Sequence, residues 1–549
     1  MTKTTCLVLA VAAVCGDLFA QSNERGVGYD AALANISSAT YYGRRGAAYP
    51  GGEIGIAFQN QLCNPGTVPV EWRSPGGSVG STILTDHPKF GFLVAREVDG
   101  RLVQISDWSY CKHAFLSLNS GSVSPCLGGC VQPPAGGAQL GVKCSDIYSA
   151  GNNASRTYLG PPAEINPWLG TWAANGSSFD VGDPATGIGP ADGLRSLVTT
   201  GMDAVKNRVT IREADIVGGV STGMYFQIHV IIEGERVENR ANNIMSRPFT
   251  LTRTSTAWTT GTTGTASFGT IMNRWPGATI TEGSNGGTGT LSDADGRFAV
   301  AVKVTGPTNG LWHYEYCVHN LDNHRGGATF SLPVCPTGRV LNIGFRDIDT
   351  NALNDWTSTV ANGRLTWSAP ATNPHNWNTL YNFWFDSDVA PGAGVAQIDQ
   401  ARIGPGALTV DVNTTAPTLQ PAVYLGAGCG SPDSTLAVNG VPSAGNAGFA
   451  LTMTSAPNTY VLMAFSDGSG NTPVAPGCNA YVDLNNYGVA GLFLTDAAGN
   501  ATMPLAVPAG LSPMSLTFQG APFVPNPPVF GLVSLTNGLT VRLASLGCQ

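Results

Sequence analysis

The sequence predicts an all-β protein: a disulfide-stapled, loop-rich N-terminal β region, a central β-sandwich and a small C-terminal β-sandwich. Charged residues make up only 12% of the chain, against roughly 25% in an ordinary soluble domain. Glycine accounts for 70 of 549 residues, nearly twice its usual share of about 7%. Short apolar runs alternate with Gly, Pro and Asn clusters, a pattern typical of strands joined by turns.

Residues 1–20 read as an export signal. Lys3 precedes an apolar run from Cys6 to Cys15, and a small residue, Ala20, stands where cleavage is expected. The run is shorter than the roughly 18 apolar residues that a transmembrane helix needs, and no later stretch approaches that length. We therefore expect a mature chain that begins at or near Gln21 and is secreted or held at the cell surface.

Cysteine usage supports the same compartment. Removing Cys6 and Cys15 from the twelve cysteines leaves ten, an even number that favours disulfides over thiolate metal sites in an oxidising compartment. The N-terminal and the C-terminal parts of the chain each then contain an odd number of cysteines. Cys548 is therefore a candidate for a disulfide with Cys63 or another N-terminal cysteine. The sequence leaves open the connectivity of Cys63, Cys111, Cys126, Cys130, Cys144 and Cys548.

The first region, residues 21–205, is predicted to be loop-rich, Cys-rich β structure. Its apolar runs are short, and its long loops suggest either a function or disulfide stapling. One helix is expected, from Asp192 to Asn207, where Leu194, Leu197 and Val205 approximate an apolar face behind a capping aspartate.

The second region, residues 206–412, is predicted to be a β-sandwich. Its clearest expected hairpin runs from Trp312 to Cys335 and closes at Gly326, which places Cys317 and Cys335 at equal distances from the turn. Opposed residues of an antiparallel pair lie close enough for a disulfide. We therefore predict a Cys317–Cys335 bond.

A polar, proline-bearing linker over residues 411–422 precedes a C-terminal sandwich over residues 423–549. Cys429 and Cys478 are expected to bridge this module. It contains no histidine and few charged residues, so general acid–base catalysis lacks its usual participants there. We expect a module that packs or docks.

The stretch from Trp108 to Trp168 concentrates the reactive side chains. His113, Asp146 and Glu164 could serve as base and orienting carboxylates for a nucleophile at Cys144 or Ser145. Their spacing does not show that they converge, and the Cys-Ser-Asp segment is equally typical of a turn whose side chains cap backbone groups.

Metal ligation has weaker support. Two Cys-x-His pairs, at Cys111 and Cys317, could present sulfur and imidazole to a metal, but structural disulfides are the favoured interpretation. No cofactor is expected, although the two Asp-x-Asp pairs could bind a structural calcium ion. The residues weighed as ligands are His319, Asp322, His324 and Arg325 for a transition metal and Asp347, Asp349, Asp386 and Asp388 for calcium.

Four aromatic residues could form a binding platform for sugar rings: Trp367, Trp377, Tyr381 and Trp384. Packing in the sandwich core is the favoured alternative.

Several segments resemble a set of large, uncharacterised exported β-rich proteins of planctomycete-type bacteria. They are residues 108–115, 144–161, 314–320 and 378–385. The tail around Cys429, Cys478 and Asp496 resembles the small C-terminal β domain of such proteins. The resemblance spans nearly the whole mature chain and carries no activity. Those proteins usually continue Ser-Trp directly into Leu-Lys-His. This chain reads Ser-Tyr-Cys111-Lys112-His113, so Lys112 and His113 are the better shared feature.

These observations favour an extracellular or cell-envelope protein with a structural or adhesive role. The alternative is an exported hydrolase or lyase that acts on an extracellular polymer through His113, Asp146 and Glu164. The expected partners are cell-surface polysaccharide or further copies of the chain. Nucleic acid is not an expected partner, because the formal net charge is −8 and basic clusters are lacking.

Overall fold

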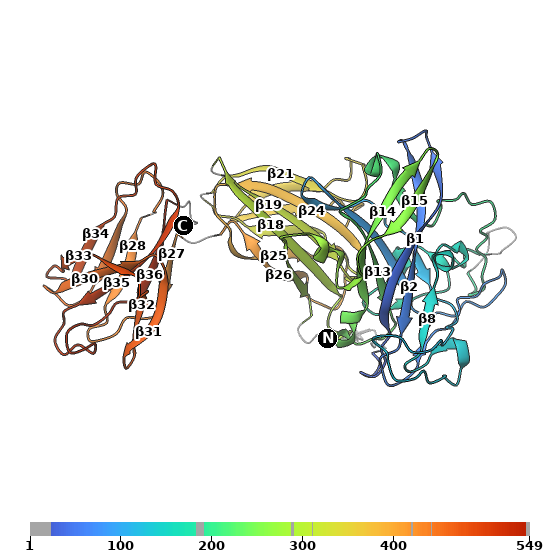
Figure 1. The fold of residues 1–549 in the computed structure, drawn as a ribbon, viewed down its shortest axis with the longest axis horizontal. Coiled ribbons are helices and arrows are strands. Elements are labelled where there is room, and N and C mark those ends of the chain that lie inside the picture. The colour runs from blue at the N-terminus through green and yellow to red at the C-terminus, as the bar shows by residue number, and fades with distance from the viewer. Residues whose placement is uncertain are drawn as a thin grey trace, which may run out of the picture.

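A computed structural model describes residues 24–182, 191–286, 290–309, 311–336, 338–418, 421–440 and 442–544. The predicted export signal therefore lies outside the described residues, as does Cys548. Antiparallel sheets make up almost all of the regular structure, which confirms the predicted all-β class (Figure 1). The helical elements are short: α1 (Ala150–Asn153) and the 3-10 turns η1 (Gly136–Ala138), η2 (Arg156–Tyr158), η3 (Pro162–Glu164), η4 (Glu213–Ile216), η5 (Val237–Asn242) and η6 (Ile271–Arg274). Over the described residues, no helix has the length and apolar character required to cross a bilayer.

The N-terminal body consists of two main sheets around one core. Phe58 of the first sheet stacks on Phe226 of the second, with ring centroids 4.2 Å apart, so the two sheets meet face to face. The first sheet contains β1 (Ala32–Gly46), β2 (Gly52–Cys63), β12 (Val209–Arg212) and β8 (Ser145–Tyr148). The second contains β15 (Ala257–Thr262), β14 (Ile244–Thr254), β13 (Met224–Ile231), β4 (Lys89–Val98), β6 (Cys111–His113) and β9 (Leu159–Gly160), with β5 (Arg101–Gln104) and β16 (Ser267–Phe268) at its margins. Two small ladders complete it: β3 (Val70–Glu71) with β7 (Gln139–Leu140), and β10 (Ile165–Asn166) with β11 (Thr171–Trp172).

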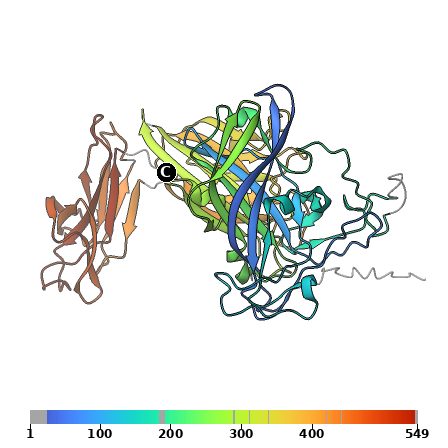
Figure 2. The same cartoon turned by 45° about the vertical axis from the view of Figure 1, so that its right-hand side comes forward.

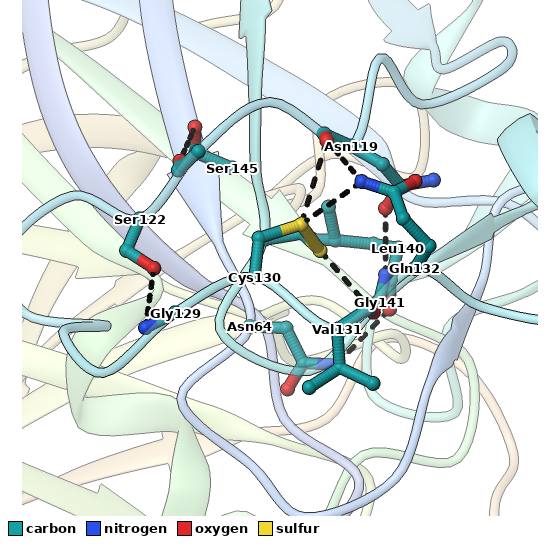
Figure 3. Close-up of a disulfide and its surroundings, with 12 residues drawn as sticks. Asn64, Asn119, Ser122, Gly129, Cys130, Val131, Gln132, Leu140, Gly141 and Ser145 are labelled. Atoms are coloured by element: carbon teal, nitrogen blue, oxygen red, sulfur yellow. Dashed lines mark hydrogen bonds between the residues drawn. A yellow bond between two sulfur atoms is a disulfide. The ribbon is translucent and has the colours of Figure 1, made fainter.

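Two disulfides staple the loops of this body. Cys63 bonds to Cys126, and Cys130 bonds to Cys144. Around the Cys130–Cys144 bond, side-chain hydrogen bonds hold the loops in place (Figure 3). The Asn119 side-chain oxygen accepts from Gly141 N at 2.7 Å, and its backbone oxygen accepts from Gln132 Nε2 at 2.9 Å. The Cys63 pairing rules out a Cys63–Cys548 bond.

The central sandwich stacks two five-stranded sheets. Alternate residues of β18, β19 and β24 enter its core, which includes Val300, Tyr316 and Phe383. One sheet has the order β17 (Thr279–Ser284), β18 (Arg297–Thr308), β19 (Leu311–Asn320), β24 (Thr379–Ser387) and β21 (Val340–Arg346). The other has the order β22 (Thr357–Ala361), β23 (Arg364–Ser368), β20 (Thr329–Pro333), β25 (Gly392–Asp399) and β26 (Thr409–Ala416). Asn362 and Gly363, with φ of 52° and 71°, form the β22–β23 turn, and a positive φ at both positions suits a two-residue hairpin.

The outer face of the β18–β19–β24 sheet is also buried. Ala301, Cys317 and Leu380 pack there against Leu93 and Leu102 of the N-terminal body. This contact fixes the two bodies side by side, as both views show (Figures 1 and 2). The domain boundary predicted between residues 205 and 206 does not fall between sheets. Strands from its two sides pair with one another: β13 with β4, and β12 with β2.

Two local predictions are wrong. β19 pairs with β18 and β24, whereas β20 belongs to the opposite sheet, so the predicted hairpin and the Cys317–Cys335 bond do not form. Cys317 is a buried free thiol, and Cys335 is disulfide-bonded to another cysteine. The predicted helix from Asp192 to Asn207 is irregular chain, and Val205 is fully buried within it.

The terminal module has its own sheets and core. Its core includes Leu451, Met463 and Val541, and its Cys429–Cys478 disulfide confirms the predicted pair. The larger sheet has the order β27 (Ala422–Leu425), β36 (Gly538–Leu543), β35 (Met514–Pro522), β30 (Tyr460–Ser466) and β33 (Tyr487–Leu494). The smaller sheet has β28 (Thr435–Asn439), β29 (Ala450–Thr454) and β34 (Asn500–Pro504), and a hairpin joins β31 (Ser469–Ala475) to β32 (Cys478–Val482).

Candidate functional site

His113 lies in a closed aromatic pocket. Its Nδ1 is 2.9 Å from Nε2 of His87, and its ring lies 4.5 Å from the Trp172 ring and 4.9 Å from the Phe179 ring. The side chain is fully buried. Burial and then the nearby Lys89 and Lys112 charges lower its pKa well below the ordinary value, so the imidazole is neutral at physiological pH.

The Asp146 carboxylate holds a loop in place through hydrogen bonds to its backbone. Its Oδ1 accepts hydrogen bonds from the backbone N of Leu118 and of Ile147, each at 3.0 Å. Burial raises the pKa of this carboxyl to about 6. The carboxylate thus satisfies backbone donors of a disulfide-stapled loop.

Glu164 is held by a third set of partners. It accepts from Ser178 N at 2.7 Å and from Trp172 Nε1 at 3.2 Å. Trp172 therefore lies between His113 and Glu164, and Asp146 contacts a different segment. None of the hydrogen bonds found for His113, Asp146 and Glu164 over the described residues joins two of them, so the predicted catalytic set is not assembled.

The predicted aromatic platform is also not formed. Trp367 and Tyr381 belong to the core of the central sandwich. Trp377 packs against buried residues of the N-terminal body. Trp384 is covered by the Arg101 guanidinium, 3.6 Å from the ring centroid. Packing in the sandwich core, the favoured alternative, describes Trp367 and Tyr381, whereas Trp377 is buried in a different cluster.

The polar residues weighed as metal ligands have separate partners. Asp322 pairs with Arg297 at 2.9 Å, Arg325 pairs with Asp295 at 3.1 Å, and His319 Nδ1 is 2.8 Å from Thr270 Oγ1. Of the calcium candidates, Asp347 and Asp349 accept backbone N–H groups of their own loop. Asp386 and Asp388 instead pair with His313 and Arg339.

A groove separates the N-terminal body from the central sandwich. A cavity of about 410 Å³ and an adjoining one of about 350 Å³ share Asn166 and His324. Glu164 lines the second cavity, but its oxygens are occupied by Ser178 and Trp172. The lining that sequence reasoning missed comes from loops distant in the chain, at Leu291, Asp295 and Ile403. The groove can hold a largely apolar group, and Asp295 in its lining is paired with Arg325.

An exposed apolar surface lies on the terminal module. We call it the outer apolar face; its members lie on or beside β30, β33 and β35. Five of them have exposed fractions between 48% and 56%: Tyr460, Val489, Leu492, Leu494 and Phe523, with the half-buried Leu462 between them. Neither β30 nor β33 contains a charged residue. At half exposure these side chains present on the order of 500 Å² of apolar surface, and patches of that size are often functional.

A sequence signal for this face exists. Residues 460–465 read Tyr-Val-Leu-Met-Ala-Phe, apolar at every position. A strand with one solvated face normally alternates with polar residues, whereas a continuous apolar run indicates that both faces become covered. Val461 and Met463 fill the module core, and Tyr460 is left exposed on the other side.

Comparisons with known proteins add little. No family model matches the chain, and no curated protein matches it. Among solved structures, the major pilin subunit of Bacillus cereus is similar at 10% identity, over 60% of this chain and 81% of that chain, with a TM-score of 0.17. A TM-score this low carries no argument about function. The resemblance to planctomycete-type proteins stays a prediction.

Proposed function

We propose that this chain is an exported structural or adhesive protein of the cell surface that works through the outer apolar face of its terminal module. That face is the observation on which the proposal rests. It is apolar, uncharged and about half exposed at its five named positions, and the largest apolar patch of a soluble protein, about 300–600 Å², is often functional.

The covalent chemistry supports the location. Disulfides such as Cys63–Cys126, Cys130–Cys144 and Cys429–Cys478 are typical of proteins in oxidising compartments outside the cytoplasm. They staple loops that carry little regular structure, which suits a protein exposed to proteases and changing conditions.

The alternative of an exported hydrolase or lyase receives no geometric support at its predicted residues. His113 is enclosed by aromatic rings, and Asp146 and Glu164 are occupied by donors of their own loops. A general base must reach its substrate proton within hydrogen-bond distance. His113 and Asp146 are covered by protein, and Glu164, which lines the second cavity, has both oxygens hydrogen-bonded to its own neighbours.

The test is retention of the chain in the cell-envelope fraction. In cells that export it, most of the wild-type chain should sediment with the envelope. A Leu492→Lys/Leu494→Lys variant should move largely to the medium, because two charges then interrupt the apolar face. Val360→Lys is the matched control: Val360 is 50% exposed on β22 of the central sandwich. Equal distribution of all three chains between envelope and medium would contradict the proposal.

A further inference from the structure

We propose that β33 of the terminal module binds an extended, uncharged segment of a partner protein as an added β-strand. The inference rests on the proposed function and names the class of partner that this end of the module takes. It follows from the unpaired backbone of β33, from the absence of charge along the strand and from the apolar side chains on both of its sides.

β33 is an edge strand of the larger sheet of the terminal module. It pairs with β30 along one side and with no other strand of the described chain along the other. Over the same residues, no loop backbone donates to or accepts from residues 487–494. The open side of the strand therefore presents a row of unpaired N–H and C=O groups, and the groups that match such a row are those of another strand.

The register identifies the residues whose backbone points to the open side. Thr495 N donates to Thr459 O at 3.0 Å at the end of the β30–β33 ladder. Opposed residues in an antiparallel ladder alternate between hydrogen-bonded and non-hydrogen-bonded pairs. The next pair, which contains Leu494, is therefore non-hydrogen-bonded, and so is the pair that contains Leu492. Both leucines direct their N–H and C=O groups away from β30.

The strand is regular around these two leucines. Residues 491–494 stay in register with β30, and the ladder shifts only between Met463 and Ala464, which are opposite Gly491 and Val489. A β-bulge can protect an edge by twisting it away. This one lies beyond Gly491, so an added strand can pair with Leu492 and Leu494 without crossing it.

β33 also lacks the residues that usually protect an exposed edge. Native sheets discourage pairing by placing charged residues or proline there. Other edge strands of this chain carry charges, such as Arg45 on β1, Glu282 on β17 and Arg346 on β21. β33 contains neither a charged residue nor a proline. A charged side chain laid beside its leucines would lose hydration without gaining an ion pair, so the partner segment is uncharged.

The side chains on both sides of β33 suit such a segment. Leu492 and Leu494 are 56% and 53% exposed on the outer apolar face. Phe493 points to the other side and packs against the module core. Side chains of an added strand alternate in the same way. One set would lie beside the two leucines, and the other would extend the core beside Phe493, so apolar and β-branched residues fit both sets.

The edge is accessible in the whole chain. In Figure 1, β30 and β33 lie at the end of the module away from the central sandwich, and β27 lies on the near side. A partner segment can therefore reach β33 without meeting the larger bodies.

The experiment is fluorescence anisotropy of a labelled probe peptide titrated with the purified mature chain. The probe alternates valine and threonine, with a lysine at each end for solubility. Wild type should bind it saturably between micromolar and submillimolar concentration. The same peptide with every backbone nitrogen methylated keeps its side chains but donates no hydrogen bonds, and it should bind at least about 10-fold more weakly.

Two substitutions at one position separate the backbone from the side chain. Leu492→Pro removes an N–H that points to the open side, so the ladder with β30 is kept. It should weaken probe binding about 5-fold or more, whereas Leu492→Ala keeps the N–H and should weaken binding less. Val360→Pro is the matched control. Val360 lies on the edge strand β22, one residue before the last pair of a two-residue hairpin, so its N–H also points outward; this variant should bind like wild type.

A wild-type chain that does not bind the probe overturns the inference. Equal binding of the methylated probe overturns it too, because the ligand would then lie on the apolar face and not along the edge. Equal losses in Leu492→Pro and Leu492→Ala would have the same meaning, and the methylated probe decides the question even where Leu492→Pro fails to fold. These outcomes are separate from the retention test. A retained chain that does not bind the probe would keep the proposed function without this partner, whereas a probe-binding chain that is not retained would remove the proposed function alone.

Discussion

Asp322 is predicted to be a major electrostatic contact between the N-terminal body and the central sandwich. Its side chain is fully buried; Arg297 Nη2 lies 2.9 Å from Oδ2, and Arg240 Nη1 of η5 lies 3.5 Å from the same oxygen. Burial alone would raise the pKa of this carboxyl, but Arg297 and Arg240 together hold it below the ordinary value.

Asp322→Ala removes the ion-pair partner of the buried Arg240 guanidinium, whereas Arg297 keeps an ion pair with Glu282 at 3.3 Å. Removing one partner of a buried ion pair costs about 3–5 kcal/mol. The N-terminal body and the central sandwich share an apolar interface and should unfold together. At about 2.1 cal/mol/K of unfolding entropy per residue, a unit of roughly 400 residues then loses about 4–6 °C of Tm.

Differential scanning calorimetry and guanidinium titration measure both quantities. The control is Glu53→Ala, which removes an exposed ion pair with Arg45 and should cost less than about 1 kcal/mol. Because the pKa of Asp322 is lowered in the folded state, its contribution is present above about pH 4 and is lost as pH falls through the folded pKa. A free energy of unfolding for Asp322→Ala within about 1 kcal/mol of wild type at pH 7 would refute this reasoning.

Three further predictions concern burial and covalent structure. Burial raises the pKa of Glu235 to about 8, so wild-type stability should fall as pH rises from about 4.3 to 8; Glu235→Gln, which mimics the protonated carboxyl, should remove this decline in denaturant titrations at pH 5 and pH 8. The Cys429–Cys478 bond has a sequence separation of 49 residues, and Cys429→Ser/Cys478→Ser should therefore destabilise the terminal module by about 4 kcal/mol; a thermal melt that matches wild type would count against it. Peptide mapping without reduction should recover Cys63–Cys126, Cys130–Cys144 and Cys429–Cys478, while Cys111 and Cys317 should react with alkylating agents only after unfolding.

Local patterns predicted the strands well and their partners poorly. The residues from Trp312 to Cys335 look like one hairpin, because two β runs flank a polar turn. The chain instead passes from one sheet of the sandwich to the other between Asn320 and Thr329. A local pattern specifies that a strand forms, but its neighbours depend on burial of both faces. Cys317 is buried against the N-terminal body, which periodicity alone does not show.

Burial that depends on tertiary contacts also explains why the surroundings of the candidate residues could not be predicted from the sequence. The polar residues around Asp322 were weighed as metal ligands, yet His319, Asp322 and Arg325 are buried where the two bodies meet. The predicted helix shows a related ambiguity. Val205 is buried and Leu197 packs against a buried cluster, while Val198 is 53% exposed. A loop lying on a sheet can bury apolar residues at irregular spacing, and over a short window this imitates helical periodicity.

The central claim is that the outer apolar face is covered when the protein is in place, and cysteine accessibility measures this directly. Over the part of the chain that the structure describes, the free thiols are Cys111 and Cys317, and both are buried. An introduced Leu492→Cys should therefore dominate labelling by a membrane-impermeant maleimide. Labelling of Leu492→Cys should be slow on intact cells and fast in dilute purified protein, whereas a Val360→Cys control should label equally fast in both. Equally fast labelling of Leu492→Cys on cells and in dilute solution would contradict the account.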